Sequence, residues 1–520
     1  MSLRDRAVAN VESALDRLAE DAPGCAVGVI VDGTTLISSC RGLASLEHGV
    51  PITPATRFYL ASVSKQVTAL ATLLAAQSGR LDLDGSIRKV IAELPTYMDS
   101  VTVRRLLEHT GGVRDYFSLG YLAGLPAEHS YSENDVLEIV GRQRSLNFAP
   151  GTDLQYSNSG FVLLAIAVGR ATGMRLDAFA REAIFAPLGM DASLFQHDHA
   201  AVVPNKALGY QKRGDQWLVA NSMLDVVGDG GMYSSLDDML SWTMNLLSPR
   251  VGEEAIGLME TPVSLPSGAY TGYGMGLGIG RHRGLTIIEH GGGLGGYRTE
   301  LLAYPTEGFA IVVLCNDAGA WPAEIACQVA ETYLAERMTP PIATAPDVAI
   351  EMLQARAGVY RSVDKYVIPL VERHGKLHIS GLPMPLRPLG PDMFAFEGDP
   401  YGVTIDFEGL DGDFVLSRAG GPTRRYTRCD PPTGVNENEF TGDFQSPEVG
   451  APCTVNRTDA GLSVSFAGQR PAALRALAPD CLWAADLGST LTFERGDDGV
   501  VRGFRADNDR VRGIAFSRIT

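Results

Sequence analysis

Long apolar runs, paired cysteines and an excess of positive charge are all missing from this chain of 520 residues. The longest apolar segments, such as residues 161–168, fall well short of the about 20 residues that span a bilayer. The first twenty residues carry charges where a secretion signal would be apolar. The seven cysteines are odd in number and scattered, without C-x-x-C spacing, which favours neither a disulfide framework nor a zinc site. We therefore expect a cytoplasmic protein that does not associate with membranes.

Basic residues are also in short supply, because 44 Lys and Arg stand against 61 Asp and Glu and leave a net charge of −17. Binding to a phosphate backbone needs a concentrated basic face, so we expect no nucleic-acid partner. The nine histidines show no metal-ligand spacing, and no P-loop, H-E-x-x-H or G-x-S-x-G motif occurs, so no metal and no cofactor are predicted. The length and the ordinary apolar fraction of 45% predict a globular chain of roughly two to four domains.

Residues 58–79 combine a hydroxyl and an amine at the start of a helix that is predicted to be buried. Ser62 and Lys65 are three residues apart, so both side chains project from one face within one turn. No charge occurs between residues 66 and 78, and apolar side chains occur all round the helix. Burial disfavours the ammonium form of Lys65, which could then accept the proton of Ser62.

The S-x-x-K pattern alone is not diagnostic, since residues 86–89 and 362–365 match it as well. The first of these copies follows a charged turn, and the second lies in a short alternating segment that predicts a strand. Neither copy opens a buried helix, so the copy at Ser62 is the candidate for chemistry.

Tyr156 and Asn158 form the only Y-x-N of the chain, in a predicted loop just before a helix. A phenol beside Lys65 could act as the base for Ser62, and the Asn158 amide could bind a substrate carbonyl. Taken alone, Y-x-N is better explained by a buried tyrosine that bonds to the local backbone. Whether Lys65 or Tyr156 is the base stays open.

His290 begins an H-G-G-G run directly after the predicted strand over residues 285–289. Glycines at the end of a strand allow a ligand to approach the backbone, so the N–H groups of Gly293 and Ser62 could form an oxyanion hole. A second H-x-G, at His109, ends a predicted helix and is interpreted as a C-cap.

Strand patterns at both ends of the first 337 residues enclose a long helical stretch. A hairpin is predicted over residues 25–41, helices dominate residues 87–248, and strands return over 285–316 before a closing helix over 320–337. This order predicts an α+β fold, in which one antiparallel sheet is flanked by helices and carries an all-helical insertion. The active centre is expected where the two layers meet.

Two Pro-rich linkers, residues 338–349 and 430–438, predict domains at 1–337, 350–429 and 439–520. The last two segments look like copies of one unit, because residues 358–362 align with 442–446. Short alternating strands predict two small antiparallel β-barrels. With no catalytic constellation of their own, they are expected to serve in packing, as a lid or in contacts of a homodimer.

Motifs in order along residues 20–337 resemble the serine β-lactamase and penicillin-binding-protein fold, in its class C β-lactamase-like branch. The motifs that carry the resemblance are SVSK, LLEHTGG, FAPGTDLQYSNSGF, IFAPLGM, GDGGMYSSLDDM, YGMGLG and HGGGLGGYRTELLAYP. The resemblance implies that Ser62 is the nucleophile, Lys65 its partner, Tyr156 the base of the second motif, Asn158 the amide of that motif and His290 the start of the third.

The third motif begins with lysine in class C β-lactamases, whereas H-G-G resembles the D-aminopeptidase, D-amino-acid amidase and esterase members. The two C-terminal barrels are similar to the layout of D-aminopeptidase. The resemblance thus implies a serine hydrolase with an acyl-enzyme that releases N-terminal D-amino acids from small peptides or amides. Asp229 or Asp486 could bind the free amine, although a turn or capping role is the simpler interpretation of each. A loop of the last barrel reaches the cleft in D-aminopeptidase, and the counterpart here, residues 483–488, looks short.

Two other functions stay open on the sequence. One is a carboxylesterase of short acyl esters, which would need no site for an amine. The other is a penicillin-binding or scaffolding protein with little turnover, whose barrels carry the interaction. The complete Ser, Lys, Tyr and His set argues against the scaffold.

Overall fold

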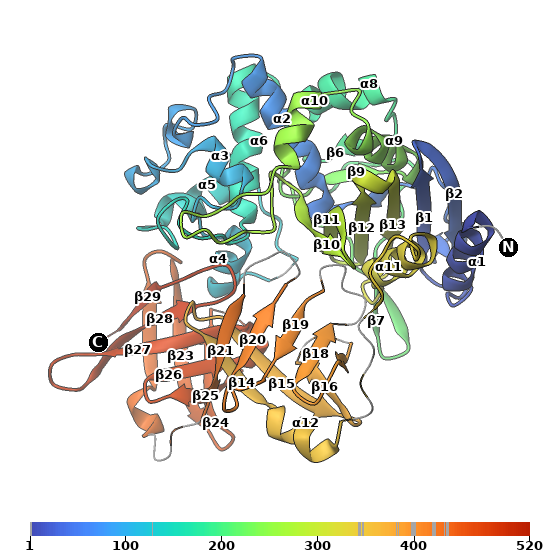
Figure 1. Ribbon diagram of the computed structural model, residues 1–520. Helices are drawn as coiled ribbons and strands as arrows, with labels where there is room; N and C mark the ends of the chain where they lie inside the picture. Colours follow the sequence, from blue (N-terminus) through green and yellow to red (C-terminus); the bar gives the residue numbers. More distant parts are fainter. Residues whose placement is uncertain are drawn as a thin grey trace.

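The computed structural model shows a layered α/β region with the β-rich C-terminal third beneath it (Figure 1). It describes residues 3–519 except 127, 342–344, 346, 347, 381, 383, 397–401, 419–422, 431, 433–435 and 468. Most of the predicted linker positions 342–347 and 431–435 therefore lie outside the described residues, and the domain boundaries stay predictions.

A six-stranded antiparallel sheet brings both ends of the first region together, in the order β10-β11-β12-β13-β1-β2. The two ends meet where β1 pairs with β13, from Cys25 opposite Cys315 to Val31 opposite Phe309. The predicted hairpin over residues 25–41 is confirmed. The strands of this sheet are β1 (Cys25–Val31), β2 (Thr34–Arg41), β10 (Gly278–His282), β11 (Leu285–Leu294), β12 (Tyr297–Tyr304) and β13 (Phe309–Cys315).

Helices cover both faces of this sheet (Figure 1). The helices α1 (Leu3–Leu15) and α11 (Pro322–Tyr333) pack on one face, where alternate side chains of β1 such as Val27 point. The helix α9 (Leu236–Leu247) packs on the other face, against β1 and β13. Because period-two alternation divides a strand between two faces, an apolar strand like β1 requires a layer on each side.

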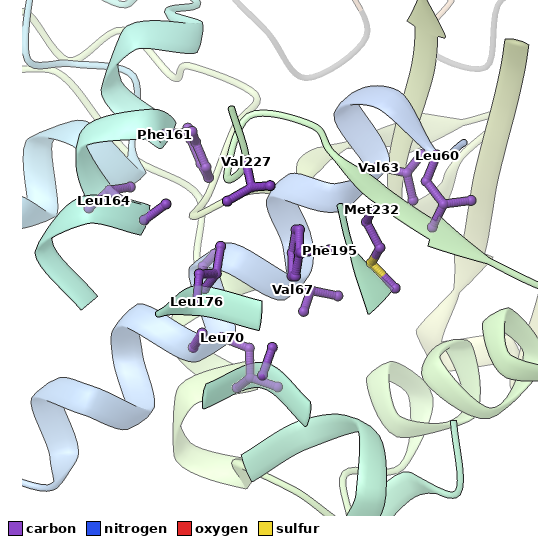
Figure 2. Close-up of a cluster of buried hydrophobic side chains, with 14 of the residues drawn as sticks. Leu60, Val63, Val67, Leu70, Phe161, Leu164, Leu176, Phe195, Val227 and Met232 are labelled. Atoms are coloured by element: carbon purple, nitrogen blue, oxygen red, sulfur yellow. The ribbon is translucent and has the colours of Figure 1, made fainter. Parts of the chain in front are cut away.

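The helix α2 (Ser64–Gln77) is the buried axis of the helical part, and a short 3₁₀ turn, Ala61–Val63, leads into it. It packs against α6 (Asn158–Thr172), whose Phe161 and Leu164 lie with Val67 and Leu70 in one apolar cluster (Figure 2). The chain leaves α2 through Gly79, whose φ of 73° suits glycine. The predicted buried helix is confirmed.

The remaining helices and short strands of this region are α3 (Val103–Leu107), α4 (Tyr116–Leu122), α5 (Glu133–Arg142), α7 (Leu176–Ala180), α8 (Ala186–Leu188), α10 (Glu253–Met259), β3 (Leu43–Ser45), β4 (Val50–Pro51), β5 (Phe58–Tyr59), β6 (Leu194–Phe195), β7 (Tyr210–Arg213), β8 (Gln216–Val219) and β9 (Met232–Ser234). Within the described residues, no single helix is both long and apolar enough to cross a membrane. One pair, Asn158–Thr172 with Leu176–Leu188, meets that test jointly but bends by 77°.

Two antiparallel eight-stranded units form the C-terminal part. The first is a nearly closed sheet in the order β16-β15-β14-β21-β20-β19-β18-β17, preceded by α12 (Ile350–Arg356). Its strands are β14 (Gly358–Ser362), β15 (Val367–Arg373), β16 (Lys376–Ile379), β17 (Leu386–Pro388), β18 (Met393–Phe396), β19 (Thr404–Asp406), β20 (Phe414–Ser417) and β21 (Arg424–Cys429).

The second unit is a closed barrel, because its last strand pairs with its first. The proposed repeat is seen at its start, since the aligned segments form β14 and β22, the first strand of each unit. Lys365 and Asp507 join the two units through bonds of 3.0 and 3.1 Å. The strands of the barrel are β22 (Gly442–Ser446), β23 (Ala451–Thr458), β24 (Gly461–Phe466), β25 (Ala472–Ala478), β26 (Cys481–Ala484), β27 (Ser489–Arg495), β28 (Val501–Asp507) and β29 (Ile514–Arg518).

Candidate active site

Ser62 lies on a strained turn between β5 and α2. The preceding residue, Ala61, has a φ of 48°, in the left-handed region that costs free energy for a residue with a Cβ atom. Ser62 lines a cavity of about 350 Å³. The turn therefore holds the hydroxyl at the mouth of α2, as the sequence predicts.

Lys65 is completely buried and points at Ser62. Its Nζ donates to Ser62 Oγ at 3.2 Å, to Asn158 Oδ1 at 2.9 Å and to the backbone oxygen of Asp229 at 2.5 Å. Burial lowers the pKa of Lys65, and the negative charge of Asp229 opposes that change. Three acceptors thus fix an amine that loses its proton more easily than a lysine in water.

Tyr156 lies between Lys65 and the last barrel. The Lys65 Nζ is 4.8 Å from the centre of the Tyr156 ring. Burial raises the pKa of Tyr156, while the nearby Ser62 hydroxyl and Arg510 guanidinium oppose that rise. The hydroxyl makes no hydrogen bond of ordinary geometry within the described chain, although Ser62 is close enough to affect its pKa. Tyr156 is a neutral phenol facing the nucleophile.

His290 is neutral, and its hydrogen bonds define its tautomer. Burial lowers the pKa of His290 to about 4. Its Nδ1 is 2.7 Å from the backbone oxygen of Gly291, which only accepts, so Nδ1 carries the proton. Its Nε2 therefore accepts a hydrogen bond from the Tyr273 hydroxyl at 3.2 Å. The imidazole thus brings no positive charge to the cavity.

The H-G-G-G run lies within a strand, whereas the sequence predicts it after one. The strand β11 continues to Leu294 and pairs with β12, with His290 opposite Leu301. A Cβ atom at Gly292 would come within 2.3 Å of the Leu60 oxygen and 3.2 Å of the Ser62 nitrogen. Glycine lets the strand lie against the nucleophile turn, because a larger residue would separate the two. Gly293 lines the cavity beside Ser62.

Asp229 lies behind Lys65, away from the cavity wall where amine binding would require it. Its side chain is 4% exposed, and its Oδ2 accepts a hydrogen bond from the Tyr116 hydroxyl at 2.9 Å. Burial raises the pKa of Asp229, and Lys65 opposes that rise. Asp486 is exposed on a turn of the last barrel and does not line the cavity either. Asn158 is likewise turned to Lys65 through its oxygen.

Two charged residues that the sequence analysis did not select line the cavity. The residues that line the cavity are Ser62, Tyr156, Tyr273, Glu289, His290, Gly291, Gly293 and Arg510. Glu289 directly precedes the H-G-G-G run, so its position next to a motif could have identified it from the sequence. No sequence signal identifies Arg510, because it lies 220 residues beyond His290 and only the packing of the barrel brings it to the cavity.

His109 also belongs to the site, although the sequence predicts it as a helix C-cap. Glu108 caps α3, and His109 follows with a φ of 56°. Its ring centre is 4.3 Å from that of Tyr156, and its Nδ1 accepts the Ser157 N–H at 3.2 Å. His109 therefore supports the loop that carries Tyr156.

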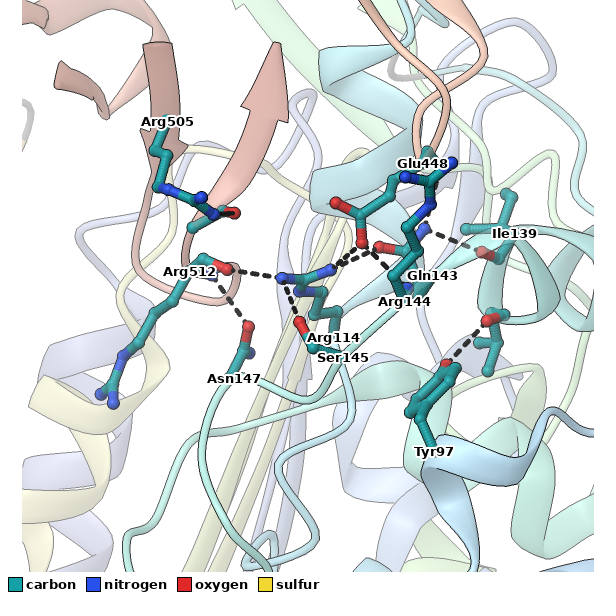
Figure 3. Close-up of polar contacts among 12 residues, drawn as sticks. Tyr97, Arg114, Ile139, Gln143, Arg144, Ser145, Asn147, Glu448, Arg505 and Arg512 are labelled. Carbon is teal, nitrogen blue, oxygen red and sulfur yellow. Dashed lines mark hydrogen bonds and ion pairs between the residues drawn. The ribbon is translucent and has the colours of Figure 1, made fainter. Parts of the chain in front are cut away.

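A loop of the last barrel, residues 508–513, borders the site. The Arg510 guanidinium carbon is 5.1 Å from the centre of the Tyr156 ring. Nearby, Arg114 donates to Glu448 of the barrel and to the Arg512 oxygen, and Arg512 N–H donates to Asn147 (Figure 3). The loop at residues 483–488, which the sequence analysis identified as a short counterpart of the loop that reaches the cleft in D-aminopeptidase, does not line this cavity. The barrel therefore contributes a residue to the wall of the cavity, whereas the sequence predicted packing, a lid or contacts of a homodimer.

One group of possible metal ligands occurs in the described part of the chain. Asp198, His199 and Asp225 place ligand atoms within 4.8 Å of one another. His199 Nδ1 already lies 2.8 Å from Asp225, and none of the three lines the cavity at Ser62. This group gives no support for metal chemistry at the candidate site.

Comparisons with known proteins agree with this architecture. The profile of the family described as Beta-lactamase matches residues 9–330. A D-aminopeptidase of Gluconobacter oxydans (strain 621H) is 27% identical over 516 residues, which cover 96% of each chain. A D-aminopeptidase of Brucella ovis (strain ATCC 25840 / 63/290 / NCTC 10512) is 31% identical over 306 residues, or 57% of each chain.

Solved structures of penicillin-binding-protein type share the fold. The octameric penicillin-binding protein homologue from Pyrococcus abyssi gives a TM-score of 0.59 at 23% identity, over 81% of this chain and all of its own. The penicillin-binding protein from Bacillus halodurans gives 0.52 at 24% identity, over 63% of this chain and 98% of its own. At these identities the two structures show similarity of fold alone.

Proposed function

Because the chain belongs to the Beta-lactamase family, whose profile spans residues 9–330, we propose that it is a serine hydrolase that acts through an acyl-enzyme on Ser62. The observation that carries the proposal is the 3.2 Å bond between Lys65 Nζ and Ser62 Oγ inside a cavity. A nucleophile within hydrogen-bond reach of its base, with the base held by a third group, is the arrangement that activated serine requires. Asn158 and the Asp229 backbone are the third group here.

Acylation begins when Ser62 Oγ attacks the carbonyl carbon of the substrate and its proton passes to neutral Lys65, directly or through the Tyr156 hydroxyl. The carbonyl oxygen becomes an oxyanion, and we assign its stabilisation to the N–H groups of Ser62 and Gly293, two residues that line the cavity. The proton then goes to the leaving amine as its bond to the acyl carbon breaks. Water attacks the resulting ester, releases the acid and restores Ser62.

The proposed substrates are small peptides or amides with an N-terminal D-residue. The relatives named D-aminopeptidase support this class, and one of them matches 96% of the chain. A cavity of about 350 Å³ lies at the small end of the range for ligand sites, which suits an amino-acid amide or a dipeptide. Glu289 is the acidic residue among the described residues that line the cavity, and we propose it as the partner for the ammonium group of such a substrate.

Replacement of the nucleophile tests the chemistry. Ser62→Ala is expected to lower kcat on D-alanine p-nitroanilide by roughly 10⁴-fold or more, because no other serine, threonine, cysteine or lysine is among the described residues that line the cavity. Mass spectrometry after incubation with a fluorophosphonate should find the label on Ser62 of the wild type and none on the variant. Turnover that survives in Ser62→Ala would remove Ser62 from this role. A wild type that neither turns over nor takes the label would favour the scaffold interpretation.

The esterase alternative differs in its need for an amine. D-alanine p-nitroanilide, its N-acetyl form and p-nitrophenyl butyrate should be compared on the wild type. The aminopeptidase is expected to prefer the free amine over the N-acetyl form by at least about 10-fold, as a charge-assisted contact predicts. Equal rates on the two forms, with fast hydrolysis of the butyrate ester, would identify an esterase. The cytoplasmic location and the homodimer stay predictions.

A further inference from the structure

We propose that Arg510, carried to the site by the last barrel, is a specificity-determining residue that binds a carboxylate on the leaving-group side of the substrate. The inference rests on the proposed function and narrows its substrates to short peptides whose leaving residue has a free carboxylate. Arg510 lines the same cavity as Ser62, and it accepts or donates no proton in the proposed acylation.

The guanidinium of Arg510 has donors to spare. Its Nε lies 3.4 Å from the carboxylate of its neighbour Asp509, which is 69% exposed. Its two terminal amino groups have no hydrogen-bond partner among the described residues. Two parallel N–H groups of a guanidinium match the two oxygens of a carboxylate, which gives a charge-assisted pair of high specificity.

Nearby acids do not satisfy this guanidinium. Asp115 contributes to the field at Arg510, but its two oxygens accept the backbone N–H groups of Ser118 and Asn158 at 3.1 and 2.7 Å. Asp509 points its charge largely into solvent.

The loop that carries Arg510 is fixed to the loop that carries Tyr156. Asn147 donates to the Arg510 backbone oxygen at 3.0 Å, and Gln155 donates to that of Asp509 at 2.9 Å. Asn508 Oδ1 accepts the N–H groups of Arg510 and Val511 at 2.9 and 2.8 Å. These bonds fix the backbone from which the Arg510 side chain projects, so less entropy is lost when a ligand orders that side chain.

The position of Arg510 beside Tyr156 determines which part of the substrate it would contact. The guanidinium lies 5.1 Å from the centre of the Tyr156 ring. In the proposed mechanism the Lys65 and Tyr156 pair returns a proton to the leaving amine. The group next to Tyr156 is thus the leaving residue, and its carboxylate is one residue from the scissile bond.

Two substrates that differ only in that carboxylate test the proposal: D-alanyl-glycine and D-alanyl-glycinamide. The wild type is expected to prefer the free acid by at least about 10-fold in kcat/KM. Arg510→Gln should lower kcat/KM on the acid by about 10- to 100-fold and change the amide by less than about 3-fold. The kcat/KM of Arg510→Lys on the acid should fall between the values of the wild type and Arg510→Gln, because lysine keeps the positive charge but lacks the two parallel N–H groups of the guanidinium. Arg502→Gln, on the same barrel and paired with the exposed Asp498, is the matched control.

Two outcomes would overturn the proposal. Equal losses on acid and amide in Arg510→Gln, with an unchanged melting temperature, would show that Arg510 only positions Tyr156. A wild type without preference for the acid would show that no carboxylate binds. If D-aminopeptidase activity itself is absent, 3-(butyryloxy)benzoate and phenyl butyrate give the same comparison. A preference for the benzoate that disappears in Arg510→Gln would then support Arg510 although the proposed peptidase substrate is wrong.

Discussion

Asp229 places a carboxylate behind Lys65, and its charge shifts the proton equilibrium of the amine. The negative charge favours the ammonium form and so raises the pKa of Lys65 against the effect of burial. Its Tyr116 partner and 4% exposure keep it in the interior. This makes Asp229 a positioning residue for the proton, and it explains an aspartate in a place where no substrate can reach it.

Asp229→Asn is expected to move the acid limb of the pH profile of kcat/KM to lower pH. Without that charge the pKa of Lys65 falls further, so the neutral amine that accepts the Ser62 proton persists into more acidic solution. A neutral ester such as p-nitrophenyl butyrate gives the profile. Asp238→Asn is the matched control, because Asp238 is also buried but bonds to Ser193, away from Lys65. A limb that stays in place or moves to higher pH would contradict this role.

His290 makes the folded protein sensitive to acid. Its pKa of about 4 lies below the ordinary value of 6.5, so between these pH values the unfolded chain binds more protons than the folded one. Stability is therefore full above about pH 6.5 and is lost as the pH falls toward 4, by up to about 3 kcal/mol. His109, whose pKa is lowered by burial as well, acts in the same direction.

Urea unfolding of the wild type and of His290→Gln at pH 7 and pH 4.5 measures this effect. The variant is expected to lose less stability between the two values, because its side chain does not titrate. The variant still contains His109, so the dependence of stability on pH should be reduced and not abolished. His48→Gln changes an exposed histidine and should leave the wild-type difference as it is. Identical pH dependence in His290→Gln and wild type would show that His290 is not held neutral.

The strand β11 and the nucleophile turn form one element of the site through Gly292. A Cβ atom there would lie 2.3 Å from both the Leu60 oxygen and Thr299 Oγ1, which is closer than real contacts allow. Gly292→Ala is expected to destabilise the protein by about 1–3 kcal/mol, because backbone atoms must shift. Gly293→Ala, whose Cβ would find its nearest atom at 3.5 Å, should cost less than about 1 kcal/mol.

Urea unfolding with a second probe of tertiary structure compares these two alanine variants. Stability is the useful readout, since Gly293 lines the cavity and its replacement can affect activity for another reason. Equal stability of the two variants would mean that the strand does not press against the turn at Gly292. Gly292 and Gly293 are thus expected to contribute differently to stability, although they are adjacent and identical in the sequence.

A buried ion pair connects the helical region to the last barrel. Arg114 and Glu448 are 2.6 Å apart and 3% and 7% exposed, and Arg114 also donates to Gln143 at 3.1 Å and to the Arg512 oxygen at 2.9 Å (Figure 3). The pair holds the barrel against the region that carries Tyr156, so the relative position of Arg510 depends on it. Through this interface the barrel helps to shape the candidate active site.

Glu448→Ala is expected to destabilise the protein by about 3–5 kcal/mol, because it leaves the Arg114 charge buried without its partner. Arg114→Met combined with Glu448→Ala should recover part of that loss, since the double variant buries no unpaired charge. Glu439→Ala, which breaks a pair with Arg495 that is 31% and 42% exposed, should cost about 1 kcal/mol or less. Thermal and urea unfolding measure all three, and a double variant no better than Glu448→Ala would show that the charge is not the cause.

The sequence by itself determined the features that depend on residues close together in the chain. The three-residue spacing within one helical turn placed Lys65 beside Ser62, and uncharged stretches and period-two alternation specified the buried helix and the strands. Motifs in their order along the chain indicated the family, and they named Tyr156 and His290 as partners that the fold then brought into one cavity.

Only the tertiary structure decided which charged residues line the cavity. Glu289 and Arg510 line the cavity, whereas Asp229 turns its carboxylate into the interior. These positions depend on side-chain direction and on how the last barrel docks, which carries Arg510 220 residues beyond His290, and short-range patterns carry no information about either. Contacts between distant segments are fixed by the total packing of the molecule, so the selectivity of this site was not readable from any single motif.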